Sequence, residues 1–551
     1  MKRFAPINLI LRQPEWILAV AASLAAIWFH FYFLGHAGAL WRDEVNLVNL
    51  ASRHTLSEMS KDSFPLLMPL LVSGWTTAGL GQSDLSLRLL GTLIGLGIPA
   101  AFWLAAWSSR RAPLFSLALF GLNLPAIIYG DSLRPYGLGS LLVVLTAAAA
   151  WSFLRNPSWS RAGVLALAAV LSAQALYQNA VLIAAVCLGA WTVCGRRGDF
   201  RAAGKVLLAA LFAAASLLPY WETISGLPAS AVSERTGFAP AVAFGNFSAV
   251  IGFPKPACAF VWEFLALAAL GFGAAALFSR GKKNNAATGV NSPDDLPVFA
   301  GATLLAALVG FTGFLWFAAL PTQPWYFLPP AALTAVCLDL GLPLPSLNRL
   351  CRAAFLVLAA ASALLAVPFA QRGLNQRFTN VDVLALRLAA EASPQDFVIV
   401  TPWYCGISFE RYFKSATPWQ TLPPLTDHSA HRYDLFREQM KTPGALQPAL
   451  DQITATLQGG HYVWVVGNVD IPRPGSRQPA DLPPPPLPGY GWSDTPYFEN
   501  WTDQTAWFLE KHSLQFECVD AGTNENVNVN EDLQLFVARG WKNSISGTNQ
   551  P

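Results

Sequence analysis

The stretch "WILAVAASLAAIWFHFYFL", residues 16–34, decides the fold. It contains no Asp, Glu, Lys or Arg, and a helix of roughly 20 apolar residues is long enough to cross the hydrocarbon core of a bilayer. Basic residues precede it and "AGA" follows at 37–39, as in a cleavable signal peptide, but the apolar part of a signal peptide is only about 7–15 residues long. We therefore expect an uncleaved first membrane span.

Similar apolar runs recur up to about residue 370. The chain has 551 residues, of which 53% are hydrophobic and 13% charged, whereas soluble domains carry roughly 25% charged residues. We predict a polytopic α-helical membrane protein with about eleven transmembrane helices, at 16–34, 88–107, 113–129, 135–154, 162–177, 179–194, 203–221, 258–279, 298–318, 326–341 and 353–369. Residues 64–80 are apolar but short and contain two prolines, which favours an interfacial or re-entrant segment.

Basic residues are concentrated in alternate loops between these runs: Lys2, Arg3 and Arg12; Arg110 and Arg111; Arg155 and Arg161; Arg196, Arg197 and Arg201; Arg280, Lys282 and Lys283; Arg349 and Arg352. Loops rich in Lys and Arg face the cytoplasm. This predicts a cytoplasmic N-terminus and an extracytoplasmic C-terminus. No long basic block occurs, so we expect no nucleic-acid partner.

The C-terminal third has a different pattern. "DFVIVTP" (396–402) and "HYVWVVG" (461–467) are short apolar runs typical of strands, and 383–393 and 442–458 have the spacing of amphipathic helices. This alternation predicts a small extracytoplasmic α/β domain. Cys405 and Cys518 are its only cysteines, and outside the cytoplasm they either form a disulfide or remain free.

The expected domain division is therefore a transmembrane domain at 1–371, a soluble α/β domain at 372–540 and a disordered tail at 541–551. Within the transmembrane domain, residues 35–87 form a first outer loop with interfacial helices. Residues 222–257 form a second outer loop, which is either a lid or a mobile connection.

Two adjacent carboxylates, Asp43 and Glu44, follow the first span in "LWRDE" (40–44). Residues 40–54 have the spacing of a helix on the membrane surface. Adjacent residues on a helix point about 100° apart, so the two carboxylates cannot both face one site. They are either helix-start residues that suit the helix dipole or part of a functional site.

Other ionisable residues are expected at the same outer depth. Arg88 begins a span, and the short loop before the fourth span carries Asp131, Arg134 and Tyr136. Arginines at span ends either extend to the headgroups or serve function, which is the default hypothesis for charge at membrane depth. With the acidic pair they would suit an anionic lipid headgroup.

Further candidates are less specific. The loop at 222–257 contains Glu222, Arg235 and Lys255, a possible substrate-binding set if the loop is a lid. In the C-terminal third, His428, His431 and Asp434 are dispersed, and we interpret them as surface residues rather than a metal site.

The order of these features resembles the GT-C glycosyltransferases, especially glycosyltransferase family 39 and the aminoarabinose-transferase-like bacterial membrane proteins. Protein O-mannosyltransferases are more distant relatives. The resemblance is carried by "LWRDE", "FPLLMPLLVSGWTTAGLGQSDLSLRLLGTLIG" (64–95) and "IIYGDSLRPYGLGSLLVVL" (127–145), and more weakly by "YFLPPAALTAVCLDLG" (326–341). Two positions depart from it. Trp325 stands where members often have Arg, and "LYQNA" (176–180) places Gln178 where many have His.

The resemblance implies transfer of a sugar from a polyprenyl-phosphate monosaccharide to a hydroxyl group of a glycan, lipid or protein acceptor, with inversion. The enzyme would work among membrane lipids at the outer face of the inner (cell) membrane, in cell-envelope glycan biosynthesis. By family position Asp43 is the general base, Glu44 assists it or binds a divalent metal ion, and Arg134, Arg88 and Tyr136 bind the donor phosphate.

Three alternatives stay open. A ligase that moves a whole lipid-linked oligosaccharide would use the same face of the membrane. A lipid or sugar flippase would also bury charge, but it usually shows paired repeats, which the sequence lacks. A membrane-anchored binding protein would concentrate its chemistry in the C-terminal third.

Overall fold

The computed structural model describes residues 13–53, 55–60, 64–224, 238–279, 294–319, 321–473, 475–520 and 525–542. The chain divides into two compact units. Unit 1 comprises Met1–His36, His54–Ile224 and Gly237–Asn375, and unit 2 comprises Ala37–Arg53, Ser225–Thr236 and Gln376–Pro551. The predicted boundary at 371 therefore lies close to the change of unit at 375. The segment 37–53, expected within the first outer loop, is grouped with the C-terminal residues.

Unit 1 is entirely helical over its described residues. Its elements are α2 (Pro14–His36), α4 (Leu56–Met59), α5 (Leu67–Trp75), η1 (Thr76–Leu80), α6 (Asp84–Ser109), η2 (Ser116–Gly121), α7 (Leu124–Gly130), α8 (Pro135–Arg155), α9 (Trp159–Ala175), α10 (Asn179–Arg197), α11 (Phe200–Ala215), η3 (Leu218–Tyr220), α13 (Pro240–Ile251), η4 (Pro256–Cys258), α14 (Ala259–Phe278), α15 (Asp295–Ala318), η5 (Pro324–Phe327), α16 (Leu328–Gly341), η6 (Leu344–Ser346) and α17 (Arg349–Leu374).

Nine helices in the described part of the chain are long and apolar enough to cross a membrane. They are Pro14–His36, Asp84–Ser109, Pro135–Arg155, Asn179–Arg197, Phe200–Ile224, Pro256–Phe278, Asp295–Ala318, Pro324–Ser346 and Arg349–Leu374. The chain is thus a polytopic helical membrane protein, as predicted. Two of the eleven predicted spans are not among the nine. Residues 113–129 fold as two short pieces, η2 and α7, because a break precedes Pro125, and α9 has only 17 residues.

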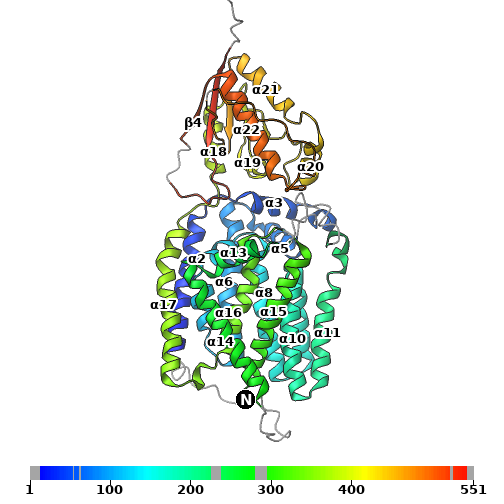
Figure 1. Cartoon of the computed structure of the whole chain (residues 1–551), viewed down its shortest axis with the longest axis vertical. Helices are drawn as coiled ribbons and strands as arrows, with labels where there is room; N and C mark the ends of the chain where they lie inside the picture. Colours follow the sequence, from blue (N-terminus) through cyan, green and yellow to red (C-terminus); the bar gives the residue numbers. More distant parts are fainter. Residues whose placement is uncertain are drawn as a thin grey trace, which may run out of the picture. The chain divides into compact units, whose positions relative to one another are not determined.

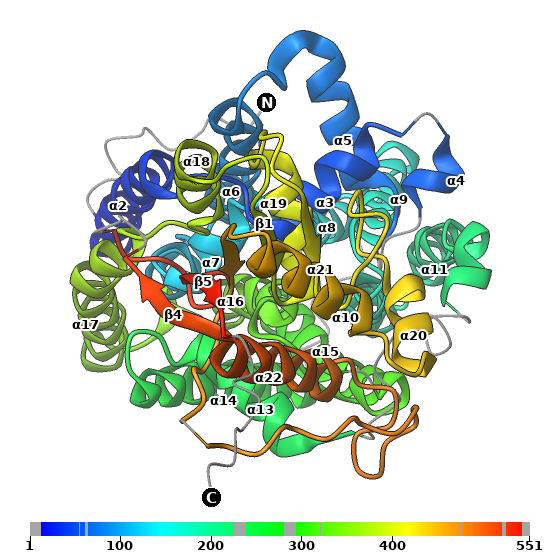
Figure 2. The same ribbon diagram turned by 90° about the horizontal axis from the view of Figure 1, so that it is seen from above.

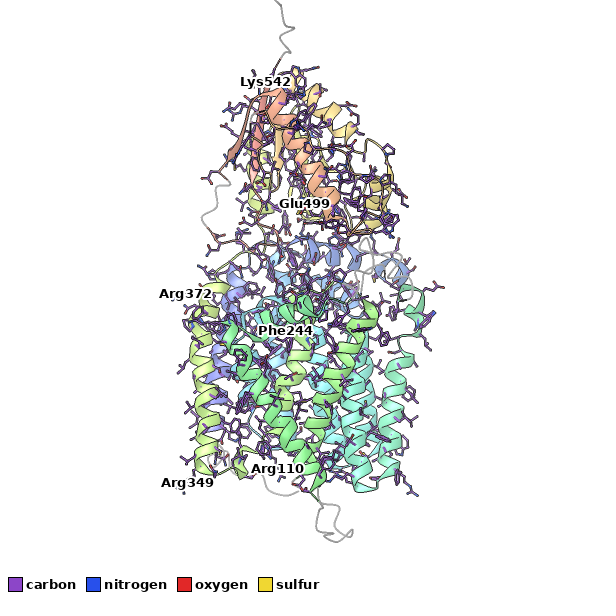
Figure 3. The ribbon with its side chains drawn as sticks, in the orientation of Figure 1. Arg110, Phe244, Arg349, Arg372, Glu499 and Lys542 are labelled. Carbon is purple, nitrogen blue, oxygen red and sulfur yellow. The ribbon has the colours of Figure 1, made fainter. Side chains whose placement is uncertain are left out.

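The helices of unit 1 run side by side as a bundle (Figure 1). Seen along the bundle, α2 and α17 lie together at one edge and α11 lies at the opposite edge (Figure 2). The helices α8 and α16 are the most buried of the nine. Arg110 and Arg349 lie at one end of the bundle, and Arg372 lies at the other (Figure 3). These three charged residues therefore lie at the ends of the bundle, where a membrane tolerates charge.

Unit 2 is an α/β fold. It contains α3 (Arg42–Ala51), α18 (Val381–Glu391), β1 (Phe397–Val400), η7 (Trp403–Cys405), α19 (Gly406–Tyr412), β2 (Trp419–Thr421), α20 (Tyr433–Lys441), α21 (Gln447–Gln458), β3 (Val463–Val466), α22 (Thr495–His512), β4 (Ser513–Val519) and β5 (Leu535–Trp541). The sheet order is β2-β1-β3-β5-β4. β1 is parallel to β2 and β3, while β5 is antiparallel to β3 and β4. The predicted α/β class is confirmed.

Both faces of the sheet are buried, which explains the unbroken apolar runs of β1 and β3. Phe397 and Ile399 point into a core with side chains of α20, α21 and α22. Val398 and Val400 point into a second core with side chains of α18 and α19. Cys405 is buried, Cys518 is exposed on β4, and both are free thiols, so the disulfide considered from the sequence is not formed.

Candidate functional site

The acidic pair lies in the first turn of α3, and its two carboxylates have different surroundings. Glu44 is completely buried, and its Oε2 accepts a hydrogen bond of 3.4 Å from the backbone N–H of Trp41 at the start of the same helix. This is the arrangement of a capping carboxylate, which also suits the positive end of the helix dipole. The helix-start interpretation therefore describes the geometry of Glu44.

Asp43 faces a different neighbour. Its side chain is 18% exposed, and its Oδ1 lies 3.3 Å from Nε2 of His431 and 3.7 Å from Nε of Arg42. The backbone N–H of His431 donates a 3.0 Å hydrogen bond to Oδ1 of Asn46, one turn further along α3. Asp43 is therefore a half-buried carboxylate held by one histidine and one arginine. His431, predicted to be a surface residue, is only 16% exposed.

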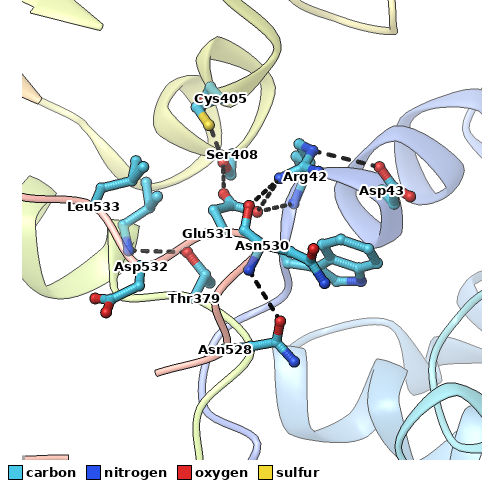
Figure 4. Close-up of polar contacts among 12 residues, drawn as sticks. Arg42, Asp43, Thr379, Cys405, Ser408, Asn528, Asn530, Glu531, Asp532 and Leu533 are labelled. Carbon is cyan, nitrogen blue, oxygen red and sulfur yellow. Dashed lines mark hydrogen bonds and ion pairs between the residues drawn. The ribbon is translucent and has the colours of Figure 1, made fainter. Parts of the chain in front are cut away.

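The segment carrying the acidic pair is fixed to the rest of unit 2 by a buried carboxylate, Glu531. Oε2 of Glu531 accepts a 2.8 Å hydrogen bond from the backbone N–H of Arg42, and its Oε1 accepts one from the hydroxyl of Ser408. Nη1 of Arg42 lies 3.9 Å from the same carboxylate and donates a 2.6 Å bond to the carbonyl of Asn530. Figure 4 shows Arg42 between Asp43 and Glu531.

Burial dominates the acidity of Glu531. It raises the pKa of this carboxyl to about 7, although Arg42 and the Ser408 hydroxyl act in the opposite direction. Aromatic contacts complete the attachment, because the Arg42 guanidinium lies 4.5 Å from the centre of the Tyr404 ring and Trp41 stacks on Phe378. Nothing in the sequence near Glu531 marked it as a partner of α3.

The basic candidates lie in unit 1, around the turn that joins α7 to α8. Arg134 precedes the first residue of α8, and Arg88 lies in the second turn of α6; both are more than nine-tenths buried. Asp131 of the turn bonds Nδ1 of His30 through its Oδ1 at 2.7 Å and interacts electrostatically with Arg88. The Arg134 guanidinium lies 4.8 Å from the ring of Phe64. Three motifs that are separate in the sequence thus meet here.

Two glycines of α6 make this meeting possible. A Cβ on Gly91 would lie 1.9 Å from the carbonyl oxygen of Asp131, and a Cβ on Gly95 would lie 1.8 Å from its Oδ1. Residues spaced by three and four share one face of a helix. Arg88, Gly91 and Gly95 therefore form a strip against which the turn can pack directly.

The two positions that depart from the family pattern lie beside Tyr136. Its ring is 6.5 Å from that of Trp325 and 5.7 Å from that of Tyr326. Nε2 of Gln178 donates a 2.8 Å hydrogen bond to the carbonyl of Tyr326. Trp325 and Tyr326 therefore place aromatic rings next to Tyr136, and Gln178 binds the backbone of the same segment.

The candidates in the loop at 222–257 are placed only in part. Glu222 follows η3, Lys255 precedes η4, and both side chains are exposed. Lys255 lies over the ring of Phe369 at 6.0 Å. Arg235 lies outside the described residues, as do residues 543–551 of the predicted tail, and the lid stays a prediction.

A divalent metal ion does not fit the acidic pair, since Glu44 is turned back onto its own helix and only Asp43 remains. Within the described ranges no group of three or more His, Cys, Asp and Glu side chains could hold a metal ion.

Asp43 and Glu44 belong to unit 2, whereas Arg88, Arg134 and Tyr136 belong to unit 1. That the two sets form one site stays a hypothesis.

The buried carboxyl of Glu531 predicts a pH dependence of stability. Its pKa is about 7 in the folded chain against 4.5 for a free group, so the folded state binds the proton more tightly. The contribution of Glu531 to stability is then fully present below about pH 4.5 and is lost as the pH rises to about 7, by up to about 3 kcal/mol. We expect Glu531→Gln to flatten this part of the profile of Tm against pH.

The control is Glu517→Gln, because Glu517 is partly exposed on β4. It should leave the profile unchanged. If the profile of Glu531→Gln has the same slope as that of the unmodified chain, then Glu531 is not the titrating group.

The close packing of α6 against the turn predicts that Gly95→Ala destabilises the chain. The added Cβ would overlap the Asp131 carboxylate, and overpacking of this kind costs about 1–3 kcal/mol. We expect a lower Tm for the purified chain. Gly163→Ala on α9 is the matched control, since its Cβ would meet nothing within 4 Å and helix propensity alone favours alanine by up to about 1 kcal/mol. Equal Tm values for the two variants would contradict the packing argument.

No protein-family model matches the sequence, and the search of curated proteins found no match. Among solved structures, the crystal structure of ArnT from Cupriavidus metallidurans bound to undecaprenyl phosphate has a TM-score of 0.47 and 14% sequence identity, covering 84% of this chain and 93% of that one. The structure of the same protein in the apo state has a TM-score of 0.48 and 14% identity, covering 82% and 92%. Similarity at this level leaves the function of the chain to be argued from its own residues.

Proposed function

We propose that this chain is a membrane glycosyltransferase. It moves a sugar from a polyprenyl-phosphate monosaccharide to a hydroxyl group of a glycan, lipid or protein acceptor at the outer face of the cell membrane. The observation that carries the proposal is the buried group of Arg88 and Arg134 around the turn at 131–134, within a bundle of membrane-spanning helices. The order of the sequence motifs, which resembles glycosyltransferase family 39, supports the same chemistry.

The two arginines suit the leaving group of this reaction. When the bond between the anomeric carbon and the phosphate oxygen breaks, negative charge develops on the phosphate. Guanidinium groups match phosphate oxygens in geometry, and cations held in place before the reaction stabilise this charge without reorganisation. The rings of Phe64 and Tyr136, 4.8 Å and 6.0 Å from the Arg134 guanidinium, restrict where it can lie.

Asp43 is the proposed general base. It takes the proton of the acceptor hydroxyl while the oxygen bonds to the anomeric carbon and the polyprenyl phosphate departs, so one bond forms, one breaks and the proton is accounted for. A single displacement of this kind inverts the anomeric centre. General-base assistance contributes typically 10²–10⁴-fold in rate.

His431 is the proposed positioning residue for this base. It contacts Oδ1 of Asp43 through its Nε2 at 3.3 Å, which directs the carboxylate. Nε of Arg42 also lies 3.7 Å from Oδ1. Geometry matters here because a displacement of about 1 Å in a reacting group can cost on the order of 10²-fold in rate.

The decisive experiment compares membrane lipids of a deletion strain complemented with the unmodified chain or with Asp43→Asn. Without transfer, we expect a polyprenyl-phosphate sugar to accumulate and one glycan or lipid to lose a sugar, as measured by mass spectrometry. The unmodified chain should clear the intermediate, whereas Asp43→Asn should not, because an amide cannot accept the proton.

Asp451→Asn, on the exposed face of α21, is the matched control and should behave like the unmodified chain. Equal amounts of both chains in the membrane exclude a folding defect. Clearance of the intermediate by Asp43→Asn would refute the assignment of the base, and the absence of any accumulated lipid-linked sugar would refute the proposed function.

With the donor identified, the role of His431 can be measured in a purified assay. We expect His431→Ala to lower kcat on the order of 10- to 100-fold with little change in KM for the lipid donor, because the residue acts on the base. His431→Gln retains a donor near the position of Nε2 and should recover most of the activity. His461→Ala is the control for loss of an imidazole. A change confined to KM, or equal activity of the Ala and Gln variants, would argue against positioning.

A further inference from the structure

A cavity of about 410 Å³ lies where α6 and α8 end, at the start of α9 in unit 1. Its polar wall comes from side chains of all three segments: Ser108, Ser152, Arg155, Asn156 and Arg161. This is the end of the bundle that also carries Arg110 (Figure 3). It lies at the opposite ends of α6 and α8 from Arg88 and Arg134, and its function needs a separate explanation.

The two arginines of this cavity, Arg155 and Arg161, have other kinds of partner than several arginines at helix ends elsewhere in unit 1. Three of those others form ion pairs with carboxylates: Arg196 with Asp294 at 3.5 Å, Arg197 with Asp295 at 2.7 Å and Arg352 with Glu15 at 2.5 Å. Pairs of this kind neutralise charge within the protein.

Arg155 and Arg161 instead donate to backbone carbonyls at helix ends. Nη1 of Arg155 bonds the carbonyl of Ser108 at 2.6 Å, and Nη1 of Arg161 bonds that of Ser152 at 2.8 Å. In the described part of the chain, no carboxylate forms an ion pair with either. A third cation, Arg110, is close enough to interact electrostatically with Arg155.

The balance of charge at the cavity is positive. Two helix C-termini contribute roughly −0.5 each, while the two guanidinium groups contribute +2 and Arg110 adds to them. The remaining N–H groups of both arginines, the amide of Asn156 and the serine hydroxyls can donate hydrogen bonds. This donor set matches the oxygens of a phosphate group.

The surroundings of the cavity are apolar and face outward. Leu104 and Trp107 also line it, lie on one face of the membrane-spanning helix α6, and are 54% and 68% exposed. Tryptophan at a helix end is typical of the membrane interface. A free phosphate ion would gain nothing from these side chains, whereas the acyl chains of a lipid would cover them.

We propose that this cavity binds the phosphate headgroup of an anionic phospholipid. Arg155 and Arg161 hold the phosphate, Asn156 adds a hydrogen bond, and Leu104 and Trp107 contact the acyl chains. Basic pockets between transmembrane helices bind anionic headgroups by the same physics. The proposal is independent of the proposed glycosyltransferase activity.

The test is native mass spectrometry of the full chain in detergent micelles that contain equal amounts of phosphatidylglycerol and phosphatidylcholine. The site variant is Arg155→Gln/Arg161→Gln, which removes both guanidinium charges and keeps polar side chains at both positions. The control is Arg201→Gln/Arg349→Gln, which removes the same charge from two exposed positions. Each lost arginine should weaken binding about fivefold, so we expect a loss of roughly 20-fold or more in retained phosphatidylglycerol for the site variant and little change for the control.

Asn156→Asp is a second variant. It keeps both arginines and their hydrogen bonds to the helix-end carbonyls, but it adds a carboxylate to the lining of the cavity. It should lose phosphatidylglycerol about fivefold, and it serves if the double variant does not fold. Equal retention of phosphatidylglycerol by the site and control variants would overturn the proposal. The proposal would also be overturned if the unmodified chain retained phosphatidylcholine as well as phosphatidylglycerol. The same holds if inorganic phosphate competed for the site as well as phosphatidylglycerol does.

Discussion

A charge taken out of water costs several kcal/mol unless a partner lies beside it, and both units are organised by this constraint. In unit 1, the Asp131 carboxylate is buried against His30 on one side and the glycine strip of α6 on the other. In unit 2, the Glu531 carboxylate is buried against the first turn of α3 and the hydroxyl of Ser408. Each carboxylate holds in place a segment that carries a candidate functional residue.

The sequence predicted the parts of the fold that depend on local pattern. A run of apolar residues long enough to span a bilayer, such as 16–34, is a sufficient signal for a membrane helix. The fully buried strands β1 and β3 were recognised for the same reason, because both of their faces are apolar. The edge strand β4 was missed, since most of its residues are partly or fully exposed, and such a strand is defined by its pairing with β5 more than by its composition.

The partners of α3 could not be predicted, because they are far away in the sequence. His431 is 388 residues from Asp43, and no local pattern joins them. One signal was available in part: Asp43 and Asn46 are three residues apart, so they share a face of α3, and polar side chains that become buried on such a face require polar partners. The identity of that partner required the structure. By contrast, the separation of Asp43 from Glu44 followed from helix geometry alone.

Arg42 connects the stability of unit 2 to the chemistry proposed for Asp43. Its guanidinium lies 3.7 Å from Asp43 and 3.9 Å from Glu531, so the two carboxylates share one cation. When Glu531 carries its proton, Arg42 is left to attract Asp43 alone; when Glu531 ionises, the attraction is divided, and the negative charge of each carboxylate opposes that of the other. Ionisation of Glu531 therefore strengthens its own interactions with Arg42 at the cost of a buried charge, because burial and not the contacts to α3 opposes the charged form. Asp43 and Glu531 are coupled through this one guanidinium group.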